Sequence, residues 1–490
     1  MKKNRDGLCQ SPNEIIFDFE EKYDPFKYKI EGFCIWPILR FAIYENLKIN
    51  TYNYLPRFSR SIKKSQIIRH IVLNLPKEIW KLLNLRRKNK DFIIVTFYDS
   101  LKDMENGHYI NIYFDYFKDL SGRAIYWYND ITGDRLKNYH SDYIDGYIVL
   151  LARVIYGEYR VKFYLDYING LYSDFKHYLK ENNVEKNFTL DVKKWYRLIR
   201  YFLSSKLIFS LFIKVIRPKL IFIENSYGQE GFIAAAKKCD IPIFEVQHGL
   251  IGRGHVGYAY GGIALKYKKN VPLPNKIITF GKYFSELLQE KEFWGPEDVP
   301  AVGFPRLEYF IKKLKNSHRK DSQLSLLISS QWTVIDKIIA FLRPIIDLID
   351  KDVLITIKPH PLESAEQTDR YKELGRVIKI LDKNIELYQA LTNSDIHCGV
   401  HSTTLFESVA FGIPTIILNI PGCEEVYTLV ENGSAKLASS PDELCNILNS
   451  VVSDKIFYSE WKRTTVINRG YFFESDPDQK LEQLLSSVLY

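Results

Sequence analysis

The chain has 490 residues, which is too long for one ordinary core and favours two large domains. Hydrophobic residues make up 46% and charged residues 26%, a balance typical of soluble globular proteins that excludes a disordered chain. The six cysteines show no CxxC pair and no regular spacing, which excludes a disulfide framework and a zinc module and favours a reducing compartment.

Positive charge is concentrated in one segment. The formal net charge is +9, and residues 57–90 alone carry eleven Lys or Arg against one acid, Glu78. Isoleucines and leucines interleave with these charges. This pattern is typical of a basic amphipathic surface on anionic lipid, and equally of a solvated basic helix pair beside the core. Nucleic acid is not an expected partner, because no recognisable binding module accompanies the charge.

The amino terminus lacks the apolar stretch of a signal peptide, and no segment reaches the ~18 uncharged apolar residues of a membrane span. The nearest segment, residues 201–215, is short and contains Lys206 and Lys214, which favours a buried core helix. We therefore expect a cytoplasmic protein, in which any membrane contact is peripheral and on the inner face of the plasma membrane.

The first half of the chain predicts a parallel sheet. Residues 91–100 are a β-rich apolar run, and residues 219–249 read as strand, helix and strand. The strands are continuous apolar runs, as expected where both faces of a parallel sheet are covered. Residues 276–281 and 301–306 predict two further short strands.

The pattern restarts after about residue 318, so a second Rossmann-like unit is predicted. Strands are expected at 324–331, 353–361, 377–381, 395–400 and 414–420, with helices between them and at 441–452. We place the boundary between Arg306 and Gln323. This gives an N-terminal domain at 1–310, a C-terminal domain at 320–470, and a helix at 471–490 that packs back toward the N-terminal domain. Ligands would bind between the domains, at the carboxyl ends of the strands.

Two motifs of the second unit follow predicted strands. Lys358 and His360 stand where a strand ends and a helix begins, so a cation and an imidazole lie beside free helix amides that bind phosphate. The alternative is a structural histidine between prolines. Ser402, Thr403 and Thr404 open the next helix with hydroxyl groups, and Glu407, one turn further on, could accept hydrogen bonds from a ribose diol. An ordinary helix cap is the alternative.

One motif of the first unit suggests a base. Gln247 and His248 follow a buried strand, and a glycine-rich loop with Arg253 and His255 comes next. A histidine there would face the cleft and could take the proton of an acceptor hydroxyl, while the loop could contact the acceptor or close as a lid. The alternative is a histidine that only packs at the domain interface. Glu224, at the end of the preceding strand, is a second candidate base.

A metal site is not expected. His397, Cys398 and His401 are close in sequence, but His397 and Cys398 are neighbours inside a predicted strand and must face opposite ways. Basic groups and helix termini could neutralise a leaving phosphate without a divalent ion, so no cofactor is required.

Together, E-x-QHG, KPHP and the S-T-T helix start with FESVAFGIP resemble the motifs of bacterial GT-B enzymes of capsule, teichoic-acid and lipopolysaccharide assembly. Members include CDP-glycerol glycerophosphotransferases, polysialyltransferases and capsule Kdo transferases. The resemblance covers about residues 219–450 and implies two Rossmann-like domains facing across a cleft. It also implies that His360 contacts the donor phosphate, that Ser402 and Thr403 bind phosphate, and that His248 is the base. The motif reads HSTT where the family has a pair of serines.

The resemblance implies a glycosyltransferase or polyol-phosphate transferase that moves a group from a nucleotide-activated donor to a growing capsule or lipopolysaccharide glycan, or a lipid-linked glycan. A CMP- or CDP-linked donor is expected first and a UDP-linked donor second, and inversion is the expected stereochemistry for a sugar. Residues 1–210 match no motif and are expected to shape the acceptor site. Two alternatives stay open. A nucleotide-sugar 2-epimerase would need no acceptor, and a non-catalytic subunit of an assembly complex would tolerate replacement of His248 and His360.

Overall fold

The computed structural model describes residues 11–52, 76, 80–81, 83–103, 108–118, 120–128, 139, 142–146, 148–184, 191–314, 323–349, 353–375 and 378–489. Most of the predicted basic segment at 57–90 lies outside these residues. Among the helices in the described part of the chain, none is long and apolar enough to cross a membrane.

The first sheet has six parallel strands in the order β10-β9-β8-β3-β6-β7. Their bounds are β3 Phe92–Thr96, β6 Ala124–Tyr128, β7 Tyr143–Asp145, β8 Leu220–Ile223, β9 Ile243–Val246 and β10 Lys276–Ile278. Alternate residues of β3 enter two different cores: Phe92 and Ile94 pack on one face of the sheet, and Ile93 and Val95 on the other. This explains why the strands read as unbroken apolar runs.

The second sheet repeats this arrangement, with the parallel order β13-β12-β11-β14-β15-β16. Its strands are β11 Leu324–Ser329, β12 Val353–Lys358, β13 Ile378–Ile380, β14 Ile396–Gly399, β15 Thr415–Leu418 and β16 Ala435–Ala438. Numbered along the chain, both sheets run 3-2-1-4-5-6. The order therefore reverses between β3 and β8 in the first sheet and between β11 and β14 in the second, where open α/β sheets bind ligands.

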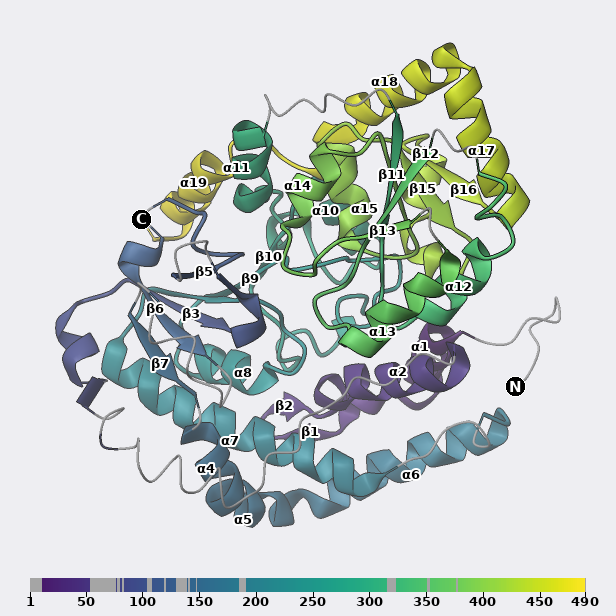
Figure 1. Ribbon diagram of the computed structural model, residues 1–490. Coiled ribbons are helices and arrows are strands. Elements are labelled where there is room, and N and C mark those ends of the chain that lie inside the picture. Colours follow the sequence, from purple (N-terminus) through teal and green to yellow (C-terminus); the bar gives the residue numbers. More distant parts are fainter. Residues whose placement is uncertain are drawn as a thin grey trace.

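Helices and two short hairpins complete the two domains (Figure 1). In the N-terminal part the helices are α1 Pro12–Tyr23, α2 Trp36–Tyr52, α4 Ile148–Ala152, α5 Glu158–Val161, α6 Leu165–Glu181, α7 Val192–Ile216, α8 Glu230–Lys238, α9 Gly262–Leu265, α10 Lys282–Gln289 and α11 Pro305–Leu314. In the C-terminal part they are α12 Ile335–Leu342, α13 Ala365–Asp369, α14 Leu387–Thr392, α15 Thr403–Ala410, α16 Thr428–Glu431, α17 Pro441–Ser453, α18 Lys455–Phe472 and α19 Pro477–Leu489. The hairpins pair β1 Lys29–Ile30 with β2 Phe33–Cys34 and β4 Leu101–Asp103 with β5 Tyr109–Asn111.

Two sequence predictions about single elements have clear outcomes. The segment 201–215 lies inside the partly buried helix α7, as expected. The predicted strand at 301–306 is wrong: Ala301 makes one isolated bridge to Thr279, and Pro305 begins α11. Proline lacks the N–H that a strand needs and is well suited to the first turn of a helix.

The end of the chain returns to the first domain. The backbone of Phe472 passes so close to Gly281 that a Cβ there would lie 2.3 Å from the carbonyl oxygen of Phe472. The helix α19 then packs with Leu481 and Leu485 against the first sheet, in the same core as Phe222. In Figure 1 this yellow helix lies beside the blue and teal elements.

Candidate functional site: the cleft between the two sheets

A buried carboxylate lies at the switch point of the first sheet. Glu224 follows β8, and its Oε2 accepts hydrogen bonds from Thr96 Oγ1 at the end of β3 (2.5 Å) and from Ser100 Oγ (2.6 Å). Burial raises the pKa of Glu224 to about 7, although these hydrogen bonds oppose the shift. The carboxyl group can therefore either hold or release a proton near neutral pH.

His248 lies one strand further along the same edge. Its Nε2 is 2.9 Å from the hydroxyl of Tyr227, and its backbone carbonyl accepts a 2.6 Å hydrogen bond from Tyr113. Its Nδ1 is buried and has no partner with good hydrogen-bond geometry among the described residues, while the backbone of Glu224 lies close enough to the ring to favour its protonated form. Burial, with the charge of nearby His255, lowers the pKa of His248 to about 4, so the imidazole is neutral at neutral pH.

Further hydrogen-bonding capacity is unused in the turn after β8. Asn225 Oδ1 and both side-chain amide atoms of Gln229 are buried and find no partner within the described part of the chain. Buried polar groups are nearly always paired with protein, water or ligand. This edge of the sheet can therefore accept a polar molecule.

The glycine-rich loop is held in place by its own polar groups. Gln247 donates to the carbonyl of Gly249 (2.9 Å) and accepts from the backbone of Phe280 (2.8 Å). His255 Nδ1 accepts from the backbone of Gly257 (3.1 Å), and burial lowers the pKa of His255 to about 4. Of these three predicted residues, Arg253 is the exposed one, with Glu290 3.5 Å away.

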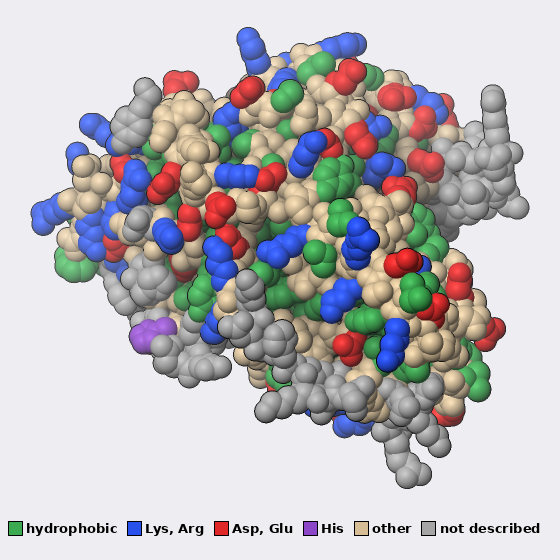
Figure 2. Space-filling view, turned by 90° about the horizontal axis from the view of Figure 1, so that it is seen from above, with side chains coloured by type: hydrophobic (Ala, Val, Ile, Leu, Met, Phe, Trp, Pro, Cys, Tyr) green, Lys and Arg blue, Asp and Glu red, His purple; other side chains and the backbone are tan. Residues whose placement is uncertain are grey.

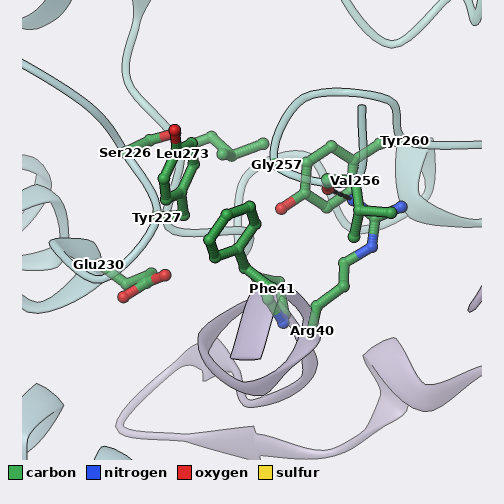
Figure 3. A pocket seen from close by; sticks show the side chains of 10 residues that line it. Arg40, Phe41, Ser226, Tyr227, Glu230, Val256, Gly257, Tyr260 and Leu273 are labelled. Carbon is green, nitrogen blue, oxygen red and sulfur yellow. Dashed lines mark hydrogen bonds between the residues drawn. The ribbon is translucent and has the colours of Figure 1, made fainter. Parts of the chain in front are cut away.

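The N-terminal helix α2 supports this loop from below (Figure 3). Arg40 is buried, pairs with Glu20 at 2.5 Å, donates to the backbone carbonyls of Val256 and Ala259, and lies 4.1 Å from the ring centre of Tyr260.

The next residue of α2 supports the histidine. Phe41 stacks on Tyr227, with ring centres 4.0 Å apart, and Tyr227 in turn contacts His248. The helix α2, which belongs to the residues 1–210 that match no motif, thus holds the loop and the histidine in position.

The predicted phosphate-binding hydroxyls gather at the switch point of the second sheet. Ser402 caps α15 and accepts from the backbone of Thr404 (3.3 Å), whose Oγ1 is 3.4 Å from Ser329 Oγ at the end of β11. Gln331 accepts from the backbone of His401 (2.9 Å) and so ties β11 to this helix start. Ser402 thus satisfies the amide of Thr404, and the hydroxyls of Ser402, Thr403 and Thr404 gather at the start of α15.

The KPHP turn lies at the same edge, but its lysine is engaged. Lys358 Nζ donates to the carbonyls of Lys383 (2.8 Å) and Pro359 (3.2 Å), and burial lowers its pKa. His360 Nδ1 accepts from the backbone of Leu362 (3.1 Å). These bonds fix the turn, and Lys358 has less capacity for a phosphate than the sequence suggests.

The two motif clusters meet across the cleft. A Cβ on Gly249, next to His248, would lie 3.9 Å from Thr403 Oγ1. On the same loop, a Cβ on Gly252 would lie 3.1 Å from Glu425, which also pairs with Lys48 of α2 at 3.4 Å. The backbone next to the predicted base thus lies one small side chain away from the predicted phosphate-binding residue Thr403.

A charge cluster that the sequence analysis missed spans the same cleft. Arg306 of α11 pairs with Glu386 at 2.6 Å, and Lys102 lies 3.6 Å from the other oxygen of Glu386. Glu407 lies close enough to Arg306 and Lys102 that their charges oppose its burial, which raises its pKa to about 7. The sequence GFPR, in which Arg306 follows a glycine and a proline at the start of α11, could have drawn attention to this residue. Nothing in the sequence indicates that Arg306 pairs with Glu386.

His397 is a satisfied core residue. Its Nδ1 is 3.1 Å from Ser408 Oγ and its Nε2 is 2.9 Å from Ser329 Oγ. No group of three or more His, Cys, Asp or Glu that could hold a metal ion occurs among the residues that the structure describes.

Comparison with known proteins identifies the architecture. No family model matches the sequence, and no curated protein matches it. Among solved structures, a UDP-GlcNAc 2-epimerase from Neisseria meningitidis bound to UDP-GlcNAc matches with a TM-score of 0.52, at 12% identity over 81% of this chain and 100% of that chain. A putative UDP-N-acetylglucosamine 2-epimerase from Listeria monocytogenes also matches with a TM-score of 0.52, at 11% identity over 81% of this chain and 96% of that chain.

The chain has the GT-B fold. A glycosyltransferase from Rickettsia africae also matches, with a TM-score of 0.49 and 14% identity over 82% of this chain and 99% of that chain. At such identities the similarity concerns the fold alone. The predicted fold class, two Rossmann-like domains facing across a cleft, is confirmed.

Proposed function

We propose that this GT-B protein is a glycosyltransferase or polyol-phosphate transferase of surface-polysaccharide assembly. The observation that carries the proposal is the buried Nδ1 of His248, which has no partner with good hydrogen-bond geometry among the described residues. The next residue, Gly249, lies opposite Thr403 at the start of α15. A base and a phosphate-binding helix start on opposite walls of one cleft can act on the two ends of a bond being exchanged.

In the proposed reaction the acceptor oxygen attacks the transferred carbon or phosphorus atom, and the bond to the nucleotide phosphate breaks. The leaving phosphate takes the electron pair and is stabilised by the amides of α15, by Ser402, Thr403 and Thr404, and by His360. The acceptor proton goes to His248 Nδ1, which leaves Nε2–H to donate to Tyr227. Glu407 would accept hydrogen bonds from the ribose, and Lys358 would hold the KPHP turn.

On the acceptor side, Arg253 and His255 would contact a glycan or lipid-linked glycan, and Gln247 would position the loop. A nucleotide-activated donor, CMP-, CDP- or UDP-linked, would be the second substrate, and no further cofactor is needed. The reaction would take place on the cytoplasmic face of the plasma membrane.

Calorimetric titration with CMP, CDP, UMP, UDP and GDP tests the donor site. We expect one nucleotide to bind and His360→Ala to weaken that binding. His177→Ala is the control, because His177 is 63% exposed and pairs with Glu181 on α6. Cytidine binding would narrow the donor to CMP- or CDP-linked groups, and uridine binding to UDP-linked groups. If no nucleotide binds, a non-catalytic subunit becomes the better description.

A 2-epimerase is the second candidate, because both solved structures above with TM-scores over 0.5 are described as such enzymes. It requires no acceptor. UDP-GlcNAc incubated with the protein alone in D2O would then exchange hydrogen for deuterium at C2, a change that NMR detects. A transferase leaves C2 unlabelled.

A further inference from the structure

Five large hydrophobic side chains are exposed along one helical run of the N-terminal domain. The run joins α4, α5 and α6 through short helical segments and lies along the lower border of the molecule in Figure 1. The exposed fractions are Val154 56%, Ile155 65%, Tyr159 61%, Phe163 57% and Tyr167 51%. Because four of them recur at every fourth residue, they line one side of the run. We call these five residues the apolar stripe.

The other side of the run is anchored, so the stripe faces outward. A Cβ on the buried Gly157 would lie 2.6 Å from Ser204 Oγ and 2.8 Å from the carbonyl oxygen of Arg200, both on α7. On the face shown in Figure 2, by contrast, hydrophobic side chains are scattered between charges of both signs. A continuous exposed apolar surface marks an interaction site.

Positive charge borders the stripe. The helix α7, which packs against the run, contains six Lys or Arg and no Asp or Glu. Arg153, next to Val154, lies near Arg197 and Arg200, and partial burial together with these two charges lowers its pKa. Arg197, Arg200 and Lys206 are paired with Asp191, Glu158 and Glu31, so the excess of positive charge on α7 comes from Lys193, Lys194 and Lys214. This excess favours a negatively charged partner.

A basic depression adjoins the stripe. Among its lining residues are Glu31, Arg160, Lys206, Lys237, Lys238 and Lys269. Arg160 connects the two features, because its guanidinium carbon is 5.4 Å from the ring centre of Phe163. The carboxylate of Glu31 is already paired with Lys206 (2.6 Å) and Arg160 (2.8 Å). Lys237 donates to the backbone carbonyl of Val271 (3.0 Å), so Lys238 and Lys269 are the lysines that can receive an anionic group.

We propose that the apolar stripe and the basic depression form one docking surface for an anionic phospholipid membrane. Tyrosine and phenylalanine are well suited to the membrane interface, and the depression offers lysines to a lipid phosphate. None of the residues named for this surface belongs to the predicted basic segment at 57–90. The inference does not depend on the proposed reaction, because vesicle binding requires neither donor nor acceptor.

Co-sedimentation of the full chain with vesicles tests the stripe. We expect binding to phosphatidylcholine vesicles that contain phosphatidylglycerol, and weak binding to phosphatidylcholine alone. Replacing both Tyr159 and Phe163 by Ser should reduce binding about tenfold. In the matched control, Ile456 and Ile467 of α18, each 70% exposed, are both replaced by Ser, and this variant should bind the vesicles like wild type.

A second variant tests the depression. Replacing both Lys238 and Lys269 by Ala should weaken binding about fivefold for each lysine. Equal binding to both vesicle types, or a stripe variant that sediments like wild type, overturns the proposal. So does light scattering that shows a dimer which the stripe variant abolishes, because the occupant is then a second copy. Binding of inorganic phosphate by a protein that ignores vesicles also contradicts it.

Discussion

His248 and Glu224 are two candidate bases with opposite pKa shifts, and the pH dependence of kcat/KM distinguishes them. A base acts in its unprotonated form. If Glu224 is the base, kcat/KM falls about tenfold per pH unit below its pKa of about 7. If His248 is the base, kcat/KM stays constant down to about pH 5, because its pKa is lowered to about 4. We expect the second profile from initial rates with the donor that binds.

Two amide variants serve as controls for that profile. His248→Gln should lower kcat by about 10²-fold or more, the usual contribution of a general base, with little change in donor binding. Glu224→Gln keeps an acceptor for Thr96 and Ser100 and should retain most of the activity. A profile that loses its fall near pH 7 in Glu224→Gln would instead assign the base to Glu224.

At the scale of single residues, the sequence predicts which side chains follow strands, and it does not predict their partners. His248 and Thr403 were expected at strand ends, and the structure brings them to opposite walls of the cleft. The bonds of Lys358 to Lys383 and of Arg306 to Glu386 join distant parts of the chain, so no local pattern predicts them.

At the scale of elements, the close approach of the His248 loop to α15 makes the size of residue 249 critical. In Gly249→Ala the new Cβ would meet Thr403 Oγ1 at 3.9 Å, an ordinary contact, so kcat should be nearly unchanged. Gly249→Leu would fill the space between the two motifs and should lower kcat at least about tenfold.

Thermal melting separates this effect from misfolding. Both Gly249 variants should melt like wild type, because the side chain projects into the cleft. Equal activity of the two variants would show that the loop and α15 do not close on the reacting groups.

The support that α2 gives to the loop predicts a large loss of stability when Arg40 is replaced. Arg40→Met leaves the buried Glu20 without its cation, with the indole N–H of Trp36 (2.6 Å) still bonded to it, and should lower the free energy of unfolding by about 3–5 kcal/mol. Arg343→Met is the matched control, since Arg343 and Glu373 pair at 2.6 Å with exposed side chains, and should cost below about 1 kcal/mol. Urea denaturation measures both, and equal losses would contradict a special role for Arg40.

The sequence predicts the order of strands and helices correctly where the strands are apolar runs bounded by turns. It failed at 301–306, where a short apolar sequence precedes proline and becomes the start of α11. It also predicted no supporting role for α2, because that role depends on contacts with distant residues such as Tyr227 and Val256. Hydrophobic periodicity predicts whether a segment forms a helix or a strand, but it does not predict which distant residues that segment contacts.

At the scale of the whole molecule, the repeated strand order explains why the fold could be predicted. Two consecutive series of alternating strands and helices specify two parallel sheets with right-handed crossover connections. In each sheet the strand order reverses at a switch point, and the predicted motif residues lie near these points. The return of α19 to the first sheet places the chain end in the first domain's core, in the direction expected for the final helix, while its partners in that core, such as Phe222, could not be read from the sequence.

The buried ionisable groups predict how stability depends on pH. Burial raises the pKa of Glu224 and Glu407 to about 7 and of Glu230 and Glu245 to about 8. Above the unfolded carboxyl pKa of about 4.3 the unfolded chain has released these protons while the folded chain still holds them, so stability falls as pH rises toward 8.

Buried histidines act in the opposite direction at lower pH. Burial lowers the pKa of His248, His255 and His401 to about 4 and of His397 to about 3, so the unfolded chain binds these protons first as pH falls below about 6.5. The two effects oppose each other between about pH 4.5 and 6.5, and the carboxyl effect dominates from there to about pH 8, where the lowered pKa of the partly buried Lys237 begins to oppose it.

We therefore expect the melting temperature to fall from about pH 6.5 to about pH 8.5. Glu245→Gln provides the specific test, because its amide oxygen can still accept the hydrogen bond of Tyr258 while the titrating proton is gone. That variant should show a smaller fall over the same range. A melting temperature that rises with pH would mean that the carboxyl groups of the cleft are ionised in the folded protein, and the pKa assignment of Glu224 as a competing base would then be wrong as well.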